Sequence, residues 1–189
     1  MPNANHKHPK RLDPRSPLVF DTRSLGPARA RSVTRTAAAP ANLRVELVSV
    51  PEAAELELDV RLERVTDGVL VTGTVAAPLA GECARCLDLF TSSTKVRFTE
   101  LFTYDASGDD ADGYLLDGDL LDLEPALRDA LVLELPLAPL CAEDCAGLCS
   151  ECGVRLADAG AGHGHADAGT DQTPGGAPVP ETRQTRKER

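Results

Sequence analysis

Hydrophobic and polar residues alternate through the middle of the chain. Residues 56–62 carry leucine or valine at every second position, with charged residues between them, which is the period of a half-buried β-strand. Asp67-Gly68 follows, a pair typical of tight hairpin turns because both residues tolerate positive φ angles. Valines then return at alternate positions, with Gly73 among them as a candidate bulge. The pattern predicts a β-hairpin over residues 55–77.

Further elements follow from the same kind of pattern. Three more strands are predicted, over residues 43–50, 94–104 and 114–116. One helix is predicted after them, with Asp122 as its N-cap, because leucine and alanine repeat at helical spacing. Pro125 suits its first turn, and Pro136 ends it. We therefore expect an α+β fold: a single domain, mainly an antiparallel sheet that can curl toward a barrel, with one C-terminal helix.

Composition and charge divide the chain into three parts. At 189 residues there is room for one domain of ordinary size plus tails. Residues 1–40 hold eight Lys and Arg against two Asp, whereas residues 41–153 hold 7 basic and 23 acidic residues. We predict a flexible basic arm over 1–40, a folded domain over 41–157 and a disordered, Gly- and Ala-rich tail over 158–189. Removal of residues 1–40 should then spare the fold.

The six cysteines fall in two tight groups and suggest a metal knuckle. Zinc takes four soft ligands at tetrahedral corners, and a C-x2-C turn supplies two of them from one short loop. Gly153, directly after a C-x2-C pair, suits the positive φ angle that such a turn often needs. We predict a structural zinc ion, with these candidate ligands: Cys83, Cys86, Cys141, Cys145, Cys149 and Cys152.

Three other interpretations of the cysteines compete with zinc. A disulfide framework suits secreted proteins, but the first residues contain no apolar segment that would direct export. A thioredoxin-like redox pair needs a C-x2-C between a strand and a helix, whereas the residues after Cys86 have a strand pattern. An iron–sulfur cluster uses the same thiolates, and spacing alone does not distinguish it from zinc.

The spacing leaves open which four cysteines share a metal ion. The four C-terminal cysteines can form a compact site by themselves. Alternatively, Cys83 and Cys86 join one of the two pairs of the C-terminal group. We favour such a shared site, because a metal that closes a long loop ties separate elements together. Loss of Cys86 should then release the metal and destabilise the domain.

The sequence gives no catalytic centre. A catalytic zinc keeps one position open for water and usually has His or carboxylate ligands, but no histidine occurs between residues 9 and 162. His163 and His165, like His6 and His8, lie in polar tails, and we expect these four side chains to be solvated. We therefore predict a non-enzymatic protein with a closed, structural metal site.

Two further classes are disfavoured. The acidic segment 105–112 lacks the closing Glu and the flanking helices of an EF-hand loop, so we predict a solvated surface loop there. Apolar runs in the chain are all shorter than the roughly 18 residues of a membrane span. We expect a cytoplasmic protein without a membrane partner.

Four segments of the chain carry a family resemblance: PLVFDTRSLG at 17–26, GTVAAPLAGECARCL, DGDLLDLEPALRDALVLELPLAPLC and DCAGLCSECGVRL. They resemble the YceD family, the bacterial large ribosomal RNA subunit accumulation proteins, in the form found in high-GC Gram-positive bacteria. The resemblance covers residues 17–157. It implies a cytoplasmic protein needed for synthesis, processing or stability of large-subunit (23S) ribosomal RNA, in a family with no agreed enzymatic activity.

The charge pattern suggests how such a protein would meet its partners. An acidic body repels phosphates, so we assign the RNA contacts to the basic arm, at Arg29, Arg31 and Arg35. The alternative is an arm folded back on the acidic body. We expect large-subunit ribosomal RNA or its precursor particle as one partner, and a basic ribosomal protein or assembly factor on the acidic face. The rival hypothesis is a zinc-stapled protein–protein adaptor without RNA contact.

Overall fold

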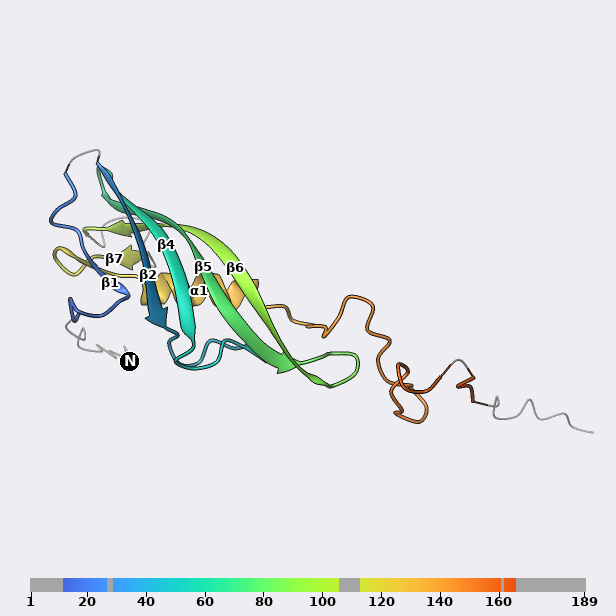
Figure 1. Cartoon of the computed structure of the whole chain (residues 1–189). Helices are drawn as coiled ribbons and strands as arrows, with labels where there is room; N and C mark the ends of the chain where they lie inside the picture. Colours follow the sequence, from blue (N-terminus) through green and yellow to red (C-terminus); the bar gives the residue numbers. More distant parts are fainter. Residues whose placement is uncertain (1–11, 27–28, 106–112, 161, 166–189) are drawn as a thin grey trace, which may run out of the picture.

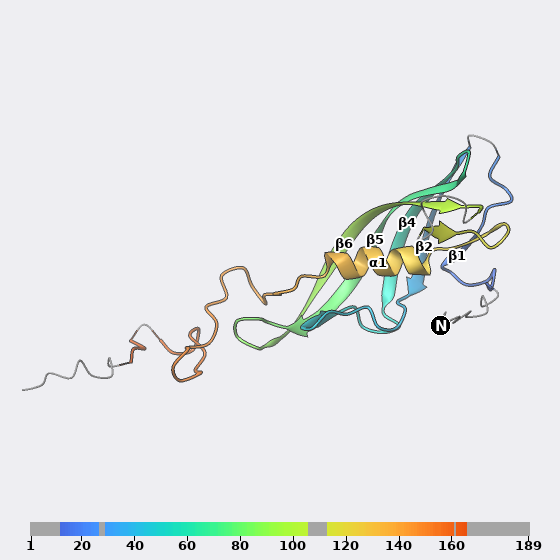
Figure 2. The same ribbon diagram turned by 180° about the vertical axis from the view of Figure 1, so that it is seen from behind.

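A long, curved antiparallel sheet forms most of the molecule, with one helix on its concave side (Figures 1 and 2). The computed structural model describes residues 12–26, 29–105, 113–160 and 162–165. His6, His8 and most of the acidic segment 105–112 lie outside these residues, as does the tail from residue 166 onward. The predicted fold class, a mainly antiparallel sheet with one helix, is confirmed.

Six strands form the main sheet. They are β2 (Ala30–Ala38), β3 (Val48–Ser49), β4 (Glu55–Arg64), β5 (Gly68–Glu82), β6 (Leu89–Thr103) and β7 (Tyr114–Leu115). Their order is β2-β4-β5-β6-β7, with β3 paired to β5 outside this path. All pairs are antiparallel except β6 and β7, which run parallel. A second, two-stranded sheet pairs β1 (Val19–Asp21) with β8 (Leu120–Asp122), and α1 spans Glu124–Glu134.

The predicted hairpin is present as β4 and β5, but its turn differs from the prediction. The Val65 N–H donates to the Gly68 carbonyl (3.0 Å), and Gly68 already starts β5. Neither Asp67 nor Gly68 has a positive φ angle. A Cβ atom on Gly68 would lie 1.9 Å from the Phe102 carbonyl oxygen. Glycine is therefore required here by the close approach of β6, not by the turn.

β5 and β6 form the longest hairpin, with 15 residues in each strand. The two strands pair without interruption along their whole length, so the predicted bulge at Gly73 is absent. An added Cβ at Gly73 would lie 3.0 Å from the ring of Phe98, which explains the small residue in a regular strand. Residues 83–88 close this hairpin, at the end of the sheet far from β1 and β7 (Figure 1).

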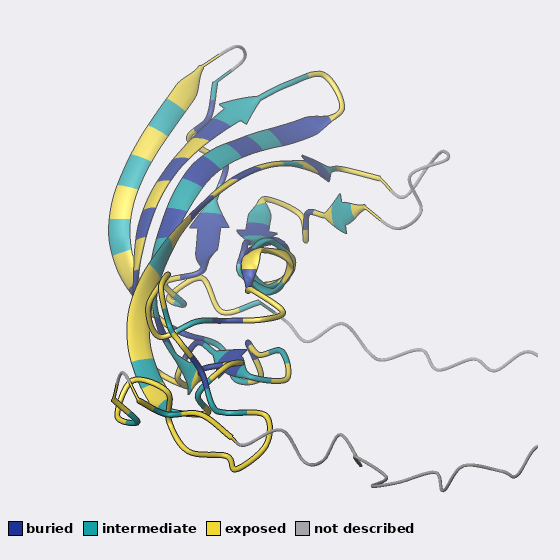
Figure 3. Cartoon of the chain, turned by 90° about the vertical axis from the view of Figure 1, so that its right-hand side faces the viewer, coloured by how far each residue is buried: buried dark blue, intermediate teal, exposed yellow. Residues whose placement is uncertain are grey.

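The core lies between the concave face of the sheet and α1. Figure 3 shows buried residues alternating with exposed ones along the strands. Leu58 of β4 and Leu127 and Leu131 of α1 are at most 1% exposed, and they belong to one hydrophobic cluster. Burial of the helix against the strands removes apolar surface from water, which is the main favourable contribution to folding. The period-two pattern of residues 56–62 is thereby confirmed.

The helix follows its predicted signals with one difference. The N-cap is Leu123, one residue after the predicted Asp122, whose carboxylate instead accepts a hydrogen bond from the Glu124 N–H (3.0 Å). Pro125 lies in the first turn, and Pro136 follows the end of the helix, as predicted. Within the described ranges, no helix has the length and apolar character needed to cross a membrane.

Residues 17–26 and 29–40 are folded, which differs from the predicted flexible arm. β2 pairs with β4 along its whole length, and the side chains of Leu18, Phe20 and Leu25 are buried in the core. Removing residues 1–40 would delete this edge strand and these core side chains. The expectation that such a deletion spares the fold is therefore not supported.

Candidate metal centre

Four cysteine sulfurs converge where the β5–β6 hairpin meets the segment after α1. Cys83 and Cys86 lie in the hairpin loop, Cys141 and Cys145 follow the helix, and their Sγ atoms all lie within 4.8 Å of one another. The Cys83–Cys145 and Cys86–Cys141 Sγ distances are 3.7 and 3.6 Å. Corners of a tetrahedron with Zn–S bonds of about 2.3 Å are about 3.8 Å apart. We call these four residues the thiolate centre.

The backbone shapes the hairpin loop into a metal knuckle. The Cys83 N–H donates to the Asp88 carbonyl (2.8 Å), and the Leu87 N–H donates to the Cys83 carbonyl (2.9 Å). Leu87 has a φ angle of 62°, in a region that usually favours glycine. The Ala84 N–H donates to the Pro139 carbonyl (2.8 Å), which fixes the segment after α1 beside the loop. Helix and hairpin thus deliver two cysteines each.

The ionisation of the thiols explains why this centre suits a cation. Hydrogen bonds from backbone N–H groups, that of Cys86 foremost, lower the pKa of Cys83 to about 6. Burial, together with the neighbouring thiols, raises the pKa of Cys86 to about 12. Several thiolates this close together repel one another unless a cation lies between them. All six cysteines are free thiols, and this donor set fits a metal ion that prefers soft ligands.

Cys149 and Cys152 lie outside the thiolate centre. Their ligand atoms and those of His163 and His165 also lie within 4.8 Å of one another. The structure thus gives two separate clusters consistent with metal binding, and it pairs Cys83 and Cys86 with the first pair of the C-terminal group. Both histidines were expected to be solvated, and the structure places them beside sulfurs instead. The H-x-H spacing, a second closely spaced ligand pair, was the signal that could have revealed them.

The three arginines assigned to RNA contact have different surroundings. Arg31 donates to the Ser24 hydroxyl (3.0 Å), and Arg35 donates to the Pro17 carbonyl (2.8 Å). Burial, with the nearby charge of Arg31, lowers the pKa of Arg35. Both guanidinium groups therefore bind the segment around β1. Arg29 is exposed.

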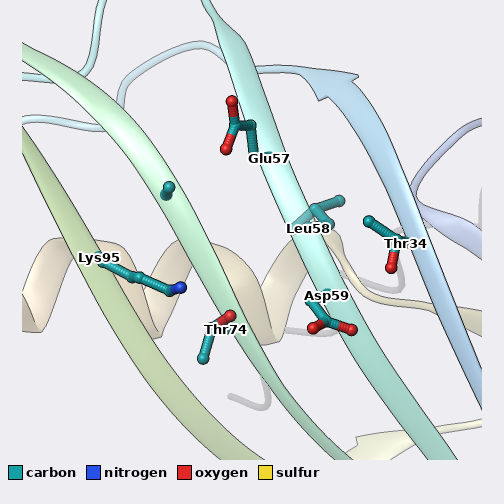
Figure 4. A pocket seen from close by; sticks show the side chains of 7 residues that line it. Thr34, Glu57, Leu58, Asp59, Thr74 and Lys95 are labelled. Atoms are coloured by element: carbon teal, nitrogen blue, oxygen red, sulfur yellow. The ribbon is translucent and has the colours of Figure 1, made fainter.

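The outer face of the sheet carries mixed charges. Figure 4 shows a shallow depression there, of about 100 Å³, lined among others by Glu57 and Asp59 of β4, Thr74 of β5 and Lys95 of β6. These side chains point away from α1, which lies behind the strands. Carboxylates beside the single lysine of this depression would repel a phosphate backbone. This part of the outer face is therefore poorly suited to RNA.

An acidic groove lies at the other end of the sheet from the thiolate centre. Its volume is about 620 Å³, and it is formed by residues 12–19, the end of β6, the region of β7 and the start of α1. Apolar side chains, including Val19 and Phe102, line it together with carboxylates. The acidic residues of the groove are Asp13, Asp117, Asp122 and Glu124.

The curved sheet and its knuckle define a class: small β-sheet proteins in which a hairpin loop carries a cysteine cluster suited to a metal ion. Residues 71–173 match the family model described as "Large ribosomal RNA subunit accumulation protein YceD", and the chain belongs to this family. The resemblance inferred from the sequence is thereby confirmed. The matched region contains most of the β5–β6 hairpin, α1 and all six cysteines.

Several curated mycobacterial proteins are similar to this chain over most of its length. Uncharacterized proteins of Mycobacterium bovis and Mycobacterium tuberculosis are each 44% identical over 158 residues, which is 79% of this chain and 75% of the relative. An uncharacterized protein of Mycobacterium leprae is 42% identical over 149 residues, or 75% of this chain and 68% of the relative. Solved structures gave no significant match.

Proposed function

We propose that the protein is a non-enzymatic factor that supports the synthesis, processing or stability of large-subunit ribosomal RNA during ribosome biogenesis. The family match over residues 71–173 carries this proposal, because the family is named for accumulation of that RNA. In this role the protein acts by binding. Its folded part positions partners, and we place it in the cytoplasm.

A structural zinc ion in the thiolate centre is part of the proposal. Four sulfurs fill a tetrahedral zinc site and leave no position for water or substrate, whereas catalytic zinc sites keep one position open. Cys83, Cys86, Cys141 and Cys145 would hold the ion. When bound, it supplies fixed geometry to the hairpin tip and no chemistry, which agrees with a non-enzymatic role.

RNA contact is assigned to the first residues of the chain. Arg31 and Arg35 have partners within the protein, so we move the contact to Arg29 and Arg15, which are exposed. Lys7, Lys10 and Arg11 precede them in the sequence and lie outside the described residues. Clustered positive charge binds phosphates and releases counterions, so this contact should weaken as salt rises.

The acidic groove supplies the second contact. Its carboxylates and apolar lining complement a segment rich in Lys and Arg that also carries apolar side chains. Basic ribosomal proteins and assembly factors offer such segments. A factor that binds RNA at one basic region and a basic protein in an acidic groove would hold both on one precursor particle.

Sedimentation of cell lysate tests this function. A tagged copy should co-migrate with large-subunit precursors at low salt, and the RNA recovered with it should be immature large-subunit ribosomal RNA. Arg15→Ala/Arg29→Ala should reduce that RNA without loss of folding, because both side chains are exposed. A soluble pool without enriched RNA would refute the proposal.

The groove also favours a second candidate function, a protein–protein adaptor without RNA contact. Asp13→Asn/Asp117→Asn removes two exposed carboxylates of the groove, and Glu52→Gln/Glu55→Gln is the matched control at exposed acidic residues elsewhere. An adaptor would lose its protein partner in the first variant and would stay away from ribosomal precursors in every variant. Co-migration that depends on Arg15 and Arg29 decides for the RNA factor instead.

A further inference from the structure

We propose that Cys149, Cys152, His163 and His165 bind a second zinc ion, separate from the thiolate centre. Their ligand atoms lie within 4.8 Å of one another. The Cys149 Sγ–His165 Nε2 distance is 3.1 Å, and the Cys152 Sγ–His163 Nε2 distance is 3.7 Å. A tetrahedral zinc ion with one sulfur and one nitrogen ligand places those atoms about 3.6 Å apart. We call these four residues the mixed centre.

The backbone around Cys149 repeats the knuckle of the hairpin loop. The Cys149 N–H donates to the Val154 carbonyl (2.8 Å), and the Gly153 N–H donates to the Cys149 carbonyl (2.9 Å). The same two bonds, 2.8 and 2.9 Å long, occur in the loop that starts at Cys83. The residue after each C-x2-C pair has a positive φ angle, 71° at Gly153 and 62° at Leu87. The chain therefore contains two knuckles of one design, and each presents two sulfurs.

The histidines are arranged as metal ligands are. Both direct Nε2 toward a sulfur, and their rings meet edge to face with centroids 4.9 Å apart. The other nitrogen of His165, Nδ1, lies 3.4 Å from a carboxylate oxygen of Glu151. A metal-bound histidine usually donates its second N–H to such a carboxylate, which fixes the ring and its tautomer. Glu151 thus has the place of that outer partner.

The two centres are held side by side but use separate ligands. The Leu148 N–H donates to the Arg85 carbonyl (3.1 Å), and Arg155 forms an ion pair with Asp88. These contacts join the second knuckle to the first without sharing a cysteine. Two thiolates and two neutral imidazoles balance the charge of one Zn²⁺, whereas four thiolates leave an excess of two negative charges. The two ions therefore occupy chemically different sites.

A second zinc ion would hold residues 149–165 in place. Glycine and alanine make up much of residues 153–164, and little apolar surface there can be buried. His163 and His165 lie on the far side of this stretch from Cys149 and Cys152, so the ion closes a loop. The inference stands apart from the proposed function, because it concerns metal content and holds whatever the protein binds.

Zinc stoichiometry tests the inference on the full chain. Native mass spectrometry of protein equilibrated with zinc should give two ions per chain, and His163→Ala/His165→Ala should give one. His6→Ala/His8→Ala is the matched control and should keep two, since these are the other histidines of the chain. His163→Cys/His165→Cys should restore two. Saturation of the unchanged chain at one ion, or two ions in His163→Ala/His165→Ala, would overturn the second site.

Cobalt spectroscopy supplies a readout of ligand type. In the Co²⁺-loaded chain, Cys149→Ser/Cys152→Ser should lower the thiolate charge-transfer band to about two thirds, because four of the six sulfurs remain as ligands. His163→Ala/His165→Ala should lower the absorption of one tetrahedral ion while the all-sulfur spectrum remains. Identical spectra for these variants and the unchanged chain would show that the mixed centre holds no ion. Circular dichroism of each variant checks that the sheet is intact.

Discussion

Arg31 and Arg35 of β2 point toward the segment that carries β1. Most other strands of the sheet present apolar side chains on this inner face. The guanidinium carbon of Arg35 lies 4.2 Å from the centre of the Phe20 ring, and its Nη1 donates to the Pro17 carbonyl. Such a group contributes both a cation–π contact and a charged hydrogen bond. Charge on a basic stretch therefore does not identify a nucleic-acid contact, since here it stabilises the fold.

Arg35→Ala should destabilise the protein by about 1–2 kcal/mol, because it removes the contact with Phe20 and the bond to Pro17. Arg35→Lys should restore little, since an ammonium lacks the planar fork. Thermal unfolding measures the effect. Arg97→Ala, at an exposed position of β6, is the control and should change stability by less than about 0.5 kcal/mol. Equal melting of Arg35→Ala and the unchanged protein would contradict this role.

Tyr114 gives a prediction about pH. Its hydroxyl donates to the Asp129 carboxylate (2.6 Å), and burial, followed by this bond, raises the pKa of Tyr114 above its usual value. The stability that the neutral phenol contributes is complete below about pH 10, the unfolded value, and is lost as pH rises through the higher folded value. Absorbance titration should show a late ionisation step that Tyr114→Phe removes. A titration unchanged by that substitution would refute the raised pKa of Tyr114.

Some conformations of single residues were predictable and others were not. A glycine after a C-x2-C pair indicated a positive φ angle, and Gly153 has one. Leu87 adopts the same conformation in the first knuckle, which residue type did not indicate because a side chain disfavours it. The hydrogen bonds of the knuckle fix this angle in spite of the side chain. Local preference therefore predicts such a position only when glycine occupies it.

At the scale of elements, alternation of apolar and charged residues predicted β4 and β5 correctly. β2 was not predicted because its inward positions include Arg31 and Arg35, so the sequence lacks an apolar residue at every second position. β1 was not predicted because three residues are too few to show a period of two. Both strands lie far from their partner strands in sequence. Their tertiary contacts therefore decide their structure.

α1 should be the element on which global stability depends. Leu127→Ala removes a side chain with no exposed surface from the contact between helix and sheet, at a cost of about 2–5 kcal/mol. Leu133→Ala, on the same helix but 86% exposed, is the matched control and should change stability by less than about 0.5 kcal/mol. Chemical denaturation measures both. Similar losses of stability in the two variants would contradict the helix position seen in Figure 2.

At the scale of the whole molecule, the apolar core and the candidate metal centres occupy different regions. The hydrophobic cluster contains residues of the strands and α1 but none of the cysteines. The thiolate centre instead ties the tip of the longest hairpin to the segment after α1. We infer that the metal stabilises one end of the protein and that the core stabilises the rest.

Cys86→Ser should therefore release the ion of the thiolate centre and loosen that end, with a smaller effect on the core. Hydrogen–deuterium exchange should quicken in residues 81–90 and 139–156, while the middle of β4 and β5 stays protected. Zinc removal by a chelator should give the same pattern. If the whole sheet exchanged faster, the metal would support the entire domain, as the sequence alone had suggested.

Prediction from the sequence identified the cysteines as candidate ligands but gave neither their pairing nor the place of the two histidines. Cysteine spacing fixes how two ligands meet in one loop, whereas the pairing of loops depends on where α1 and the long hairpin end. The helix delivers Cys141 and Cys145 beside Cys83 because Pro136 and Pro139 turn the chain there, and Pro139 bonds to Ala84. Such long-range placement follows from packing of the core, which no motif records.

The long hairpin also sets a distance. Phe102 of β6 lines the acidic groove, and Leu89, at the other end of the same strand, adjoins the knuckle. Thirteen steps of about 3.3 Å separate these residues by about 43 Å along the strand. A molecule seated in the groove is thus too far away to collide with one at the knuckle. The length of β6 thus sets the distance between the acidic groove and the knuckle. Lengthening both hairpin strands by two residues would increase this distance by about 7 Å while leaving each end unchanged.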